Sequence, residues 1–253
     1  MSAGGACYAV IGDPVSHSLS PAMQSAAFAA AGISATYEAV RVTREDVAAF
    51  VSRARAGEFA GFNVTTPLKE AMLEHLDESD DSVREARAVN TVKVESSRLI
   101  GHNTDGAGFV RALRELWSFE PRDAAILILG VGPAARAISQ ALNKAGATGV
   151  WSWSRHSGLL VGSRREGAMD LMVQATPPLA FIPPAILALV GPKTKIFDLN
   201  YGTPYSSIAP NLGGERSDGL PLLLHQGVLS FECWTGRPAP LEAMRAALGC
   251  DRG

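Results

Sequence analysis

The sequence predicts an α/β fold in two domains. Segments with the patterns of strands and helices alternate through residues 8–116, which is typical of a parallel sheet covered by helices. The apolar run 126–129 then leads through Gly130 and Gly132 into an Ala-rich helical segment, as in a second α/β unit. The polar segment 117–123, which contains a proline, separates the two parts. We therefore predict a first domain at 1–116 and a second at 117–236, with a cleft between them.

In the first domain, apolar residues predict the strands, and capping or turn residues predict where the helices begin. We expect strands at 8–12, 37–42 and 59–64, a hairpin at 91–95 and 98–101, and helices at 21–31, 44–56, 80–87 and 107–116. Ser20 and Thr43 are the expected N-caps of the first two helices. Thr66-Pro67 predicts the start of a further helix, which would hold Lys69 in its first turn.

The rest of the chain shows the same signals. We expect strands at 125–129, 149–154, 171–174 and 196–199, and helices at 133–145, 221–234 and 240–248. The stretch between Arg155 and Leu171 is rich in Gly and Arg and is short.

Composition excludes several classes of protein. The chain has 253 residues, 47% of them hydrophobic, and its net charge of −2 gives no electrostatic basis for binding nucleic acid or an anionic membrane. No apolar run is long enough to span a membrane, and residues 1–6 lack the features of a signal peptide. Three scattered cysteines and five scattered histidines favour a reduced, cytoplasmic protein without a metal site. The sequence leaves open whether the protein is a monomer or a homodimer.

The motif Gly130-Val131-Gly132 indicates a dinucleotide site. Glycines between a strand and a helix let the backbone approach a pyrophosphate, and the helix N-terminus supplies free N–H groups. Ala135 is the third small residue of this pattern, and Pro133 suits the first helical turn. The alternative is an ordinary tight turn between a strand and a helix, which the motif alone does not exclude.

A set of polar residues lies at the ends of elements in the first domain. Its members are Ser18, Ser20, Asn63, Thr66, Lys69, Asn90 and Asp105. Each has a simple structural explanation as a helix cap, a turn residue or, for Lys69, a solvated charge beside Glu70. A Lys in the first turn of a helix opposes the helix dipole at a cost of about 0.3–1 kcal/mol, however, which suggests a function. Together these residues could hold a small polyhydroxy carboxylate.

A series of motifs, in order along nearly the whole chain, carries a family resemblance. In the first domain they are Gly12-Asp13-Pro14 with Ser18-Leu19-Ser20-Pro21, Asn63-Val64-Thr65-Thr66-Pro67-Leu68-Lys69, Ala88-Val89-Asn90-Thr91 and Asn103-Thr104-Asp105-Gly106. In the second half they are Gly130 to Ala137, Ala175-Thr176-Pro177, Gly219 with Leu223 and Gln226, and Phe231 with Trp234-Thr235-Gly236. With these motifs the chain resembles the shikimate dehydrogenases.

The resemblance implies a substrate domain, a Rossmann domain that binds NADP, and a C-terminal helix within 237–253 that packs back on the substrate domain. It implies that Lys69 and Asp105 form the catalytic pair, and it leaves open which of them moves the proton. The substrate-binding residues that it implies are Ser18, Ser20, Asn63, Thr65, Lys69, Asn90, Asp105, Tyr201 and Gln226. The cofactor-binding residues that it implies are Gly130, Val131, Gly132, Pro133, Ala134, Ser154, Arg155, Ala175, Thr176 and Gly219.

The implied reaction is the reversible transfer of a hydride between NADPH and 3-dehydroshikimate, giving shikimate, as part of aromatic amino acid biosynthesis. The choice of NADP has separate support. NAD sites place an acidic residue about 20 residues after the first glycine, and here that place holds Ser154-Arg155 and no acid. Arg164 and Arg165 could also contact a phosphate, although an exposed Arg pair is more often only solvated.

The sequence also departs from the family pattern. Gln24-Ser25 stands where the family usually has His-Asn, and Gln174 stands where it has Asn. The short stretch between Arg155 and Leu171 predicts a reduced Rossmann domain. Two alternatives therefore stay open. One is a paralogue that acts on quinate or aminoshikimate, and the other is a substrate-binding homologue with impaired cofactor binding.

Overall fold

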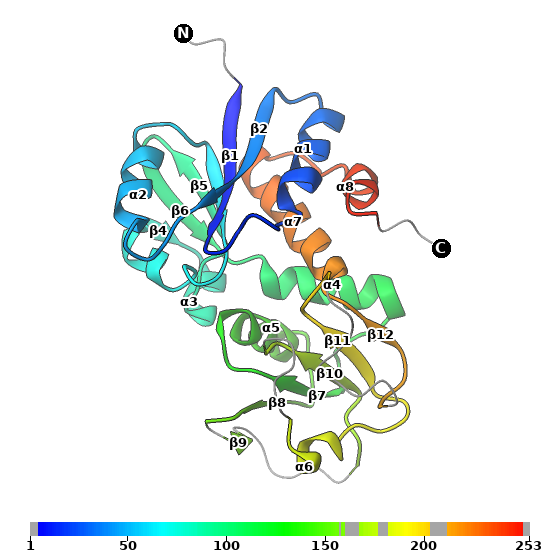
Figure 1. Cartoon of the computed structure of the whole chain (residues 1–253). Helices are drawn as coiled ribbons and strands as arrows, with labels where there is room; N and C mark the ends of the chain where they lie inside the picture. Colours follow the sequence, from blue (N-terminus) through cyan, green and yellow to red (C-terminus); the bar gives the residue numbers. More distant parts are fainter. Residues whose placement is uncertain (1–4, 157, 160–166, 177–181, 203–211, 250–253) are drawn as a thin grey trace. The chain divides into compact units, whose positions relative to one another are not determined.

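The computed structural model describes residues 5–156, 158–159, 167–176, 182–202 and 212–249 (Figure 1). The chain forms two compact units, unit 1 with residues 1–108 and 223–253 and unit 2 with residues 109–222. Both divisions fall inside helices, α4 (Asp105–Trp117) and α7 (Leu220–Thr235). Each of these helices therefore contributes residues to both units. The boundaries that we predict from the sequence, 116/117 and 236/237, fall instead at the C-terminal ends of the same two helices.

Unit 1 contains a six-stranded sheet of order β2-β1-β3-β5-β6-β4 among its described residues. Its strands are β1 (Ala6–Gly12), β2 (Ala35–Arg41), β3 (Gly61–Val64), β4 (Glu78–Ser79), β5 (Thr91–Glu95) and β6 (Arg98–His102). Strands β2, β1 and β3 are parallel, whereas β5 is antiparallel to both β3 and β6. The predicted hairpin is confirmed, and it makes this sheet mixed rather than wholly parallel.

The predicted helices of unit 1 are present with ends shifted by a few residues, except for the one expected after Thr66-Pro67. Besides parts of α4 and α7, the confirmed helices are α1 (Ser20–Ala30), α2 (Val47–Arg55), α3 (Asp81–Ala86) and α8 (Leu241–Ala247). The 3₁₀ helix η1 (Ala71–His75) was not predicted. Ser20 is the first residue of α1 rather than its cap, and its backbone N–H donates to Ser18 Oγ at 3.3 Å. Thr43 bonds to Asp46 instead of capping α2 directly. The final helix, α8, packs beside α1.

The expectation that Lys69 lies in the first turn of a helix was wrong. Residues 66–70 form turns, and η1 begins only at Ala71. The backbone explains this, because the Lys69 carbonyl oxygen accepts a hydrogen bond from the Val89 N–H at 2.9 Å instead of from a residue further along a helix. The argument from the helix dipole therefore does not apply to Lys69. The same hydrogen bond ties its backbone to the chain that enters β5.

Unit 2 contains a sheet of order β12-β11-β10-β7-β8-β9 among its described residues. Its elements are β7 (Ala125–Leu129), α5 (Pro133–Lys144), β8 (Gly149–Ser154), β9 (Gly158–Leu159), β10 (Leu171–Gln174), α6 (Pro184–Leu187), β11 (Lys195–Asp198) and β12 (Arg216–Ser217). The strands are parallel except for β9, which is antiparallel to β8. The predicted strands and helices are confirmed. The elements that were not predicted, β9, α6 and β12, are too short to show a periodic pattern.

Strand β7 explains why the sequence shows an uninterrupted apolar run. Ile126 and Ile128 pack into one hydrophobic cluster, and Ala125, Leu127 and Leu129 pack into another. All five side chains are fully buried, so both faces of the strand are covered. The strand ends at Gly130, which places the Gly motif at the carboxyl edge of the sheet. No helix among the described residues is long and apolar enough to cross a membrane.

Candidate active site

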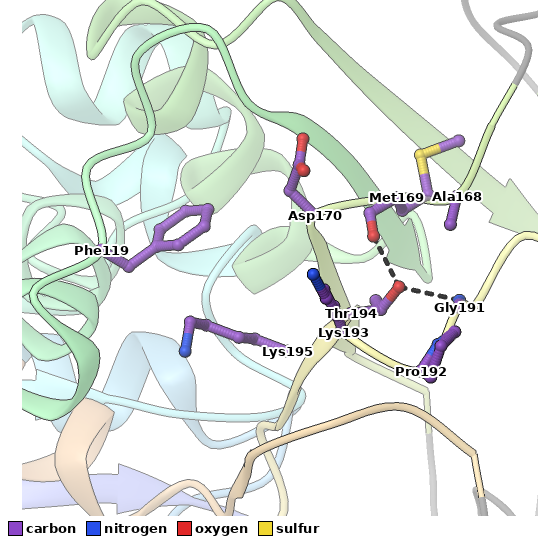
Figure 2. Close-up of a pocket in the computed structure, with 9 residues that line it drawn as sticks. All are labelled: Phe119, Ala168, Met169, Asp170, Gly191, Pro192, Lys193, Thr194 and Lys195. Carbon is purple, nitrogen blue, oxygen red and sulfur yellow. Dashed lines mark hydrogen bonds between the residues drawn. The ribbon is translucent and has the colours of Figure 1, made fainter.

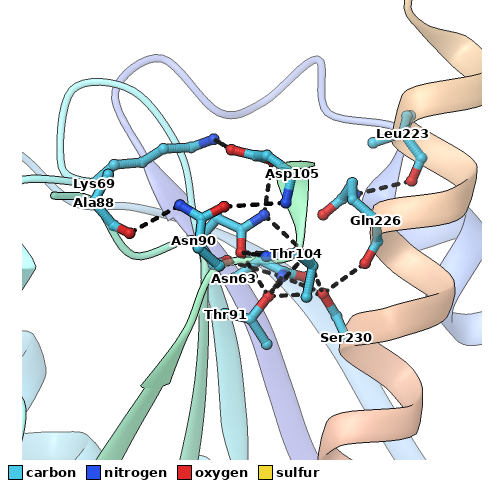
Figure 3. A network of polar contacts seen from close by, with 11 residues as sticks. Asn63, Lys69, Ala88, Asn90, Thr91, Thr104, Asp105, Leu223, Gln226 and Ser230 are labelled. Carbon is cyan, nitrogen blue, oxygen red and sulfur yellow. Dashed lines mark hydrogen bonds and ion pairs between the residues drawn. The ribbon is translucent and has the colours of Figure 1, made fainter. Parts of the chain in front are cut away.

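Lys69 and Asp105 form a close ion pair in unit 1 (Figure 3). Lys69 Nζ lies 2.6 Å from Asp105 Oδ2, and the two side chains are only 13% and 8% exposed. Lys69 comes from the turn after β3, and Asp105 is the first residue of α4. A simple cap would point its carboxylate at the amides of its own helix, whereas this carboxylate binds Lys69.

Asn90 holds the other oxygen of Asp105. Its Nδ2 donates to Asp105 Oδ1 at 2.8 Å and to Thr104 Oγ1 at 2.9 Å, and its Oδ1 accepts from the Thr104 backbone N–H at 2.8 Å. Both ends of the amide therefore have partners that fix its orientation. Asn90 lies directly before β5 and is buried, and its fixed side chain holds the Asp105 carboxylate in one orientation.

Asn63, in β3, lies in the same network. Its Nδ2 lies 3.0 Å from the Asn90 carbonyl oxygen and from Ser230 Oγ, and its Oδ1 accepts from the Tyr37 hydroxyl at 2.7 Å. Burial raises the pKa of Tyr37 well above its usual value, so this phenol keeps the proton that it donates. The Ser20 side chain acts to lower that pKa, but this effect is smaller than the effect of burial. The network thus runs from Tyr37 through the two Asn side chains to Asp105 and Lys69.

Four buried residues of this network were not on the predicted list: Tyr37, Thr91, Thr104 and Ser230. Thr91 directly follows Asn90, and Thr104 directly precedes Asp105, in the motifs that carry the family resemblance. These two residues could therefore have been predicted from the sequence. Ser230 lies four residues after Gln226 on α7, the spacing that puts two side chains on one helix face. Tyr37 lies in a strand that the sequence did not connect with the site.

The remaining candidates of unit 1 lie near this network. Gln226 Nε2 donates to the Leu223 carbonyl oxygen at 2.9 Å, and the Gln226 carbonyl accepts from Ser230 Oγ (Figure 3). Thr65 comes directly after β3, and its N–H donates to the Ile11 carbonyl at 2.9 Å. Ser18 lies before α1, where its Oγ accepts from the N–H of Ser20.

An ion pair between His102 and Asp80 supports the chain before Asp105. His102 Nδ1 lies 2.7 Å from Asp80 Oδ2, and the Asn103 N–H donates to Ser82 Oγ at 2.8 Å. The Asp80 carboxylate and, to a lesser extent, Cys233 raise the pKa of His102 to about 10. Burial acts to raise the pKa of Asp80, but hydrogen bonds from His102 and Ser82 outweigh it and lower that pKa to about 2.

This pair predicts a pH-dependent contribution to stability. A raised His pKa stabilises the fold fully below the unfolded value of about 6.5, and the contribution is lost as the pH rises toward the folded pKa. Replacing His102 with Gln should therefore lower the free energy of unfolding more at about pH 6 than at about pH 9. Urea unfolding of both proteins at the two pH values measures this. An equal difference at both values would mean that the pair does not couple to folding.

In unit 2, the Gly motif has the geometry of a pyrophosphate site. Gly130 has φ +132°, and a Cβ there would lie 2.9 Å from the Ala175 carbonyl oxygen. Gly132 is the N-cap of α5, without a side-chain hydrogen bond, and a Cβ there would meet nothing within 4 Å. The first turn of α5 has no acidic residue. Open space beside uncapped N–H groups is what a bound phosphate requires.

The other cofactor candidates surround the carboxyl edge of the same sheet. Ser154 ends β8 and is followed by exposed Arg155, and no acidic residue stands there. Ala175 and Thr176 directly follow β10, and the Thr176 hydroxyl accepts from Gln174 Nε2 at 2.8 Å. At Gly219 a Cβ would lie 2.2 Å from the Leu199 carbonyl oxygen, so only glycine fits. These residues therefore fit a dinucleotide with a ribose phosphate.

Four further predicted residues lie in unit 2. Tyr201 follows β11 in unit 2 and is partly buried. Val131 is exposed, and Pro133 and Ala134 begin α5. Arg164, Arg165 and Pro177 lie outside the described residues.

A surface pocket of about 420 Å³ lies at the opposite edge of this sheet (Figure 2). Except for Phe119, its lining residues precede or begin strands β10 and β11, and they include Asp170, Lys193 and Lys195. Thr194 Oγ1 accepts from the Gly191 N–H at 2.9 Å in its wall. Ligands of open α/β sheets bind at the carboxyl ends of strands, so this pocket does not belong to the cofactor site.

Comparison with known proteins identifies the family. Residues 10–92 match the shikimate dehydrogenase substrate binding domain, and residues 219–248 match the shikimate 5'-dehydrogenase C-terminal domain. The chain is 38% identical over 264 residues to shikimate dehydrogenase (NADP(+)) of Desulfitobacterium hafniense, covering 95% of this chain and 96% of that protein. The chain belongs to the shikimate dehydrogenase family. The resemblance predicted from the motifs is confirmed.

Solved structures of shikimate dehydrogenases share the fold. The Thermus thermophilus enzyme in complex with NADP(H) and shikimate has a TM-score of 0.84 and 34% identity, over 96% of this chain and 98% of that chain. A neighbour of different activity, the 5-ketofructose reductase of Gluconobacter, has a TM-score of 0.83 and 29% identity, over 98% of this chain and 99% of that one. The predicted α/β fold, with a substrate domain and a Rossmann-like domain, is confirmed, but this fold serves more than one substrate.

Proposed function

We propose that the chain catalyses the reversible, NADP-dependent interconversion of 3-dehydroshikimate and shikimate. The observation that carries this proposal is the continuous polar network that joins Tyr37 and Asn63 to the Lys69–Asp105 pair. This network brings together hydroxyl groups, the side-chain amides of Asn63 and Asn90 and the ammonium of Lys69, which come from different elements of unit 1. A ring with a carboxylate and several hydroxyls needs this combination of groups.

Lys69 is the group that acts on the substrate oxygen in this mechanism. Reduction of a ketone leaves negative charge on that oxygen, which an ammonium stabilises and to which a positioned acid gives a proton. Nζ of Lys69 has three N–H donors, one of which binds Asp105 at 2.6 Å. Asp105 accepts one of these bonds and so orients Nζ, and Asn90 in turn orients Asp105. Ser18 and Ser20 would bind the substrate carboxylate through their hydroxyls.

The residues at the carboxyl edge of the unit 2 sheet would hold NADP. Gly130 and Gly132 would let the backbone approach the pyrophosphate, and the N-terminus of α5 would donate to it. Arg155 would bind the ribose 2′-phosphate. When bound, NADPH supplies the hydride that reduces the ketone.

We expect replacement of Arg155 with Ala to reduce discrimination between NADPH and NADH. A hydrogen bond to a charged group contributes about 1.5–3 kcal/mol, so the Kd for NADPH should rise about 10–100-fold. The Kd for NADH should change little, because NADH has no 2′-phosphate. Fluorescence titration of both cofactors measures the two changes. Arg136, which is partly exposed in the first turn of α5, is the matched control for a loss of nearby positive charge.

An equal weakening of both cofactors in the Arg155→Ala variant would contradict the assignment of Arg155 to the 2′-phosphate. So would an Arg136→Ala variant that loses the preference for NADPH while Arg155→Ala keeps it. In that case Arg136 would take the assigned role.

Turnover of several substrates tests the proposed function. We would measure kcat/KM for shikimate, quinate and aminoshikimate with NADP, and for 5-ketofructose with NADPH. The proposal predicts the highest value for shikimate. A higher value for quinate or aminoshikimate would support a paralogue, and a higher value for 5-ketofructose would assign the chain to the activity of its Gluconobacter neighbour.

We also propose that the protein acts in the cytoplasm, as a monomer or a homodimer. The few, scattered cysteines support the location in a reducing compartment. Light scattering of the purified protein distinguishes the two oligomeric states.

A further inference from the structure

Ser230 lies buried where helix α7 meets the sheet of unit 1, with none of its surface exposed. Its Oγ lies 3.0 Å from Asn63 Nδ2 and 2.8 Å from Thr91 Oγ1, and it donates to the Gln226 carbonyl oxygen at 3.0 Å (Figure 3). A hydroxyl has one proton to donate. Nδ2 of Asn63 is the donor in its contact with Oγ, and the one proton of Oγ is shared between the Gln226 carbonyl oxygen and Thr91 Oγ1. Ser230 therefore joins α7 to two strands.

These contacts fix the orientation of the Asn63 amide. Its Oδ1 accepts from the Tyr37 hydroxyl, and its Nδ2 donates toward Ser230 and the Asn90 carbonyl. Thr91 Oγ1 also lies 3.0 Å from Asn90 Oδ1, so the Thr91 hydroxyl connects Ser230 to the Asn90 amide. Loss of Ser230 Oγ would leave buried hydrogen-bonding groups of Asn63 and Thr91 without one of their partners.

Close packing around Gln226 holds α7 in one position. A Cβ at Gly227 would lie 2.2 Å from Met23 Cε, and a Cβ at Gly108 would lie 2.7 Å from the Gln226 backbone nitrogen. Gln24 Nε2 donates to the Gly227 carbonyl oxygen at 2.9 Å. The helix backbone therefore cannot shift freely, and the Ser230 hydroxyl is presented to the strands at a fixed point.

We propose that Ser230 is a positioning residue of the substrate pocket. It fixes Asn63 directly and Asn90 through Thr91, without touching the substrate. This inference rests on the proposed function, since it takes Asn63 and Asn90 as substrate-binding residues. The buried Ser230 hydroxyl, which contacts the substrate-binding side chains, would thus contribute to the selection between polyhydroxy substrates.

Replacing Ser230 with Ala should raise KM for shikimate about five- to tenfold, which is the effect of one lost neutral hydrogen bond. The kcat should change less than about twofold, because the bonds from Asn90 to Asp105 and from Asp105 to Lys69 do not include Ser230. The ratio of kcat/KM for shikimate to that for quinate should fall. A residue with only a structural role would lower the melting temperature and leave KM unchanged.

Thr235→Val on the same helix is the matched control. Thr235 Oγ1 donates to the Phe231 carbonyl at 2.8 Å, the same bond to the residue four earlier that Ser230 makes, but it has no bond to the sheet among those described. This variant should keep the wild-type KM. Thr91→Val removes the other end of the 2.8 Å contact, so its effect on KM should not add to that of Ser230→Ala in the double variant.

A folded Ser230→Ala protein with wild-type KM and wild-type substrate ratio would overturn this inference, as would fully additive effects in the double variant. If Ser230→Ala does not fold, Thr91→Val gives the same test from the strand, and an unchanged KM would again overturn it. Failure of the proposed function is distinguishable, because the wild-type protein would then not turn over shikimate at all.

Discussion

Replacing Lys69 with Ala is expected to lower kcat for shikimate by about 10²–10⁴-fold, the usual contribution of a positioned general acid or base. The physical reason is that Nζ is the cation held at Asp105 and the one that we assign to the reacting oxygen. Asn90 continues to bind Asp105 in the variant, so the fold should persist at reduced stability. Steady-state rates and urea unfolding, measured on the same preparation, separate the two effects.

Lys93→Ala is the matched control for this variant. Lys93 also belongs to unit 1 and pairs with a carboxylate, Glu95, at 2.8 Å, but its side chain is 32% exposed and lies outside the network. It should keep wild-type kcat. If Lys69→Ala is too unstable to purify, Lys69→Gln retains a neutral donor for Asp105 and should show the same loss of rate. Near-normal kcat in either Lys69 variant would refute the assigned role.

Gly132→Ala should weaken NADPH binding by about 10–100-fold without loss of the fold, the effect of one or two hydrogen bonds to a charged group. A Cβ at Gly132 meets nothing within 4 Å in the protein, so the methyl group occupies only the space that we assign to the pyrophosphate. Shikimate binding, measured by calorimetry without cofactor, should stay unchanged. Fluorescence titration with NADPH gives the affinity.

Gly130→Ala is the informative contrast. This residue has φ +132°, and its Cβ would lie 2.9 Å from the Ala175 carbonyl oxygen, so the substitution should destabilise unit 2 by about 1–3 kcal/mol. Gly132→Ala should not. Normal NADPH affinity in a folded Gly132→Ala protein would place the pyrophosphate elsewhere.

The sequence predicted those elements whose structure depends only on neighbouring residues of the chain. Strand β7 was predictable because burial of both faces leaves an uninterrupted apolar run. The Gly130 turn was predictable because no other residue adopts its backbone conformation beside Ala175. In both cases the physical constraint acts on neighbouring residues of the chain.

Prediction failed where the constraint comes from distant residues. Lys69 was expected in a helix, but its carbonyl bonds to Val89, which lies far along the chain. Tyr37 and Ser230 belong to the network only because β2 and α7 pack near β3. The sequence around each residue does not show which elements pack together. The sequence motifs did contain Asn90 and Asp105, but the hydrogen bond between them is a result of folding.

The most direct test of the central claim is the absorbance of NADPH after shikimate is added to the purified protein with NADP. The account predicts steady NADPH formation that depends on both compounds and is nearly abolished in Lys69→Ala. Absence of NADPH formation, while calorimetry still shows that shikimate binds, would contradict the claim. The polar network would then serve binding alone, and unit 2 would not support hydride transfer.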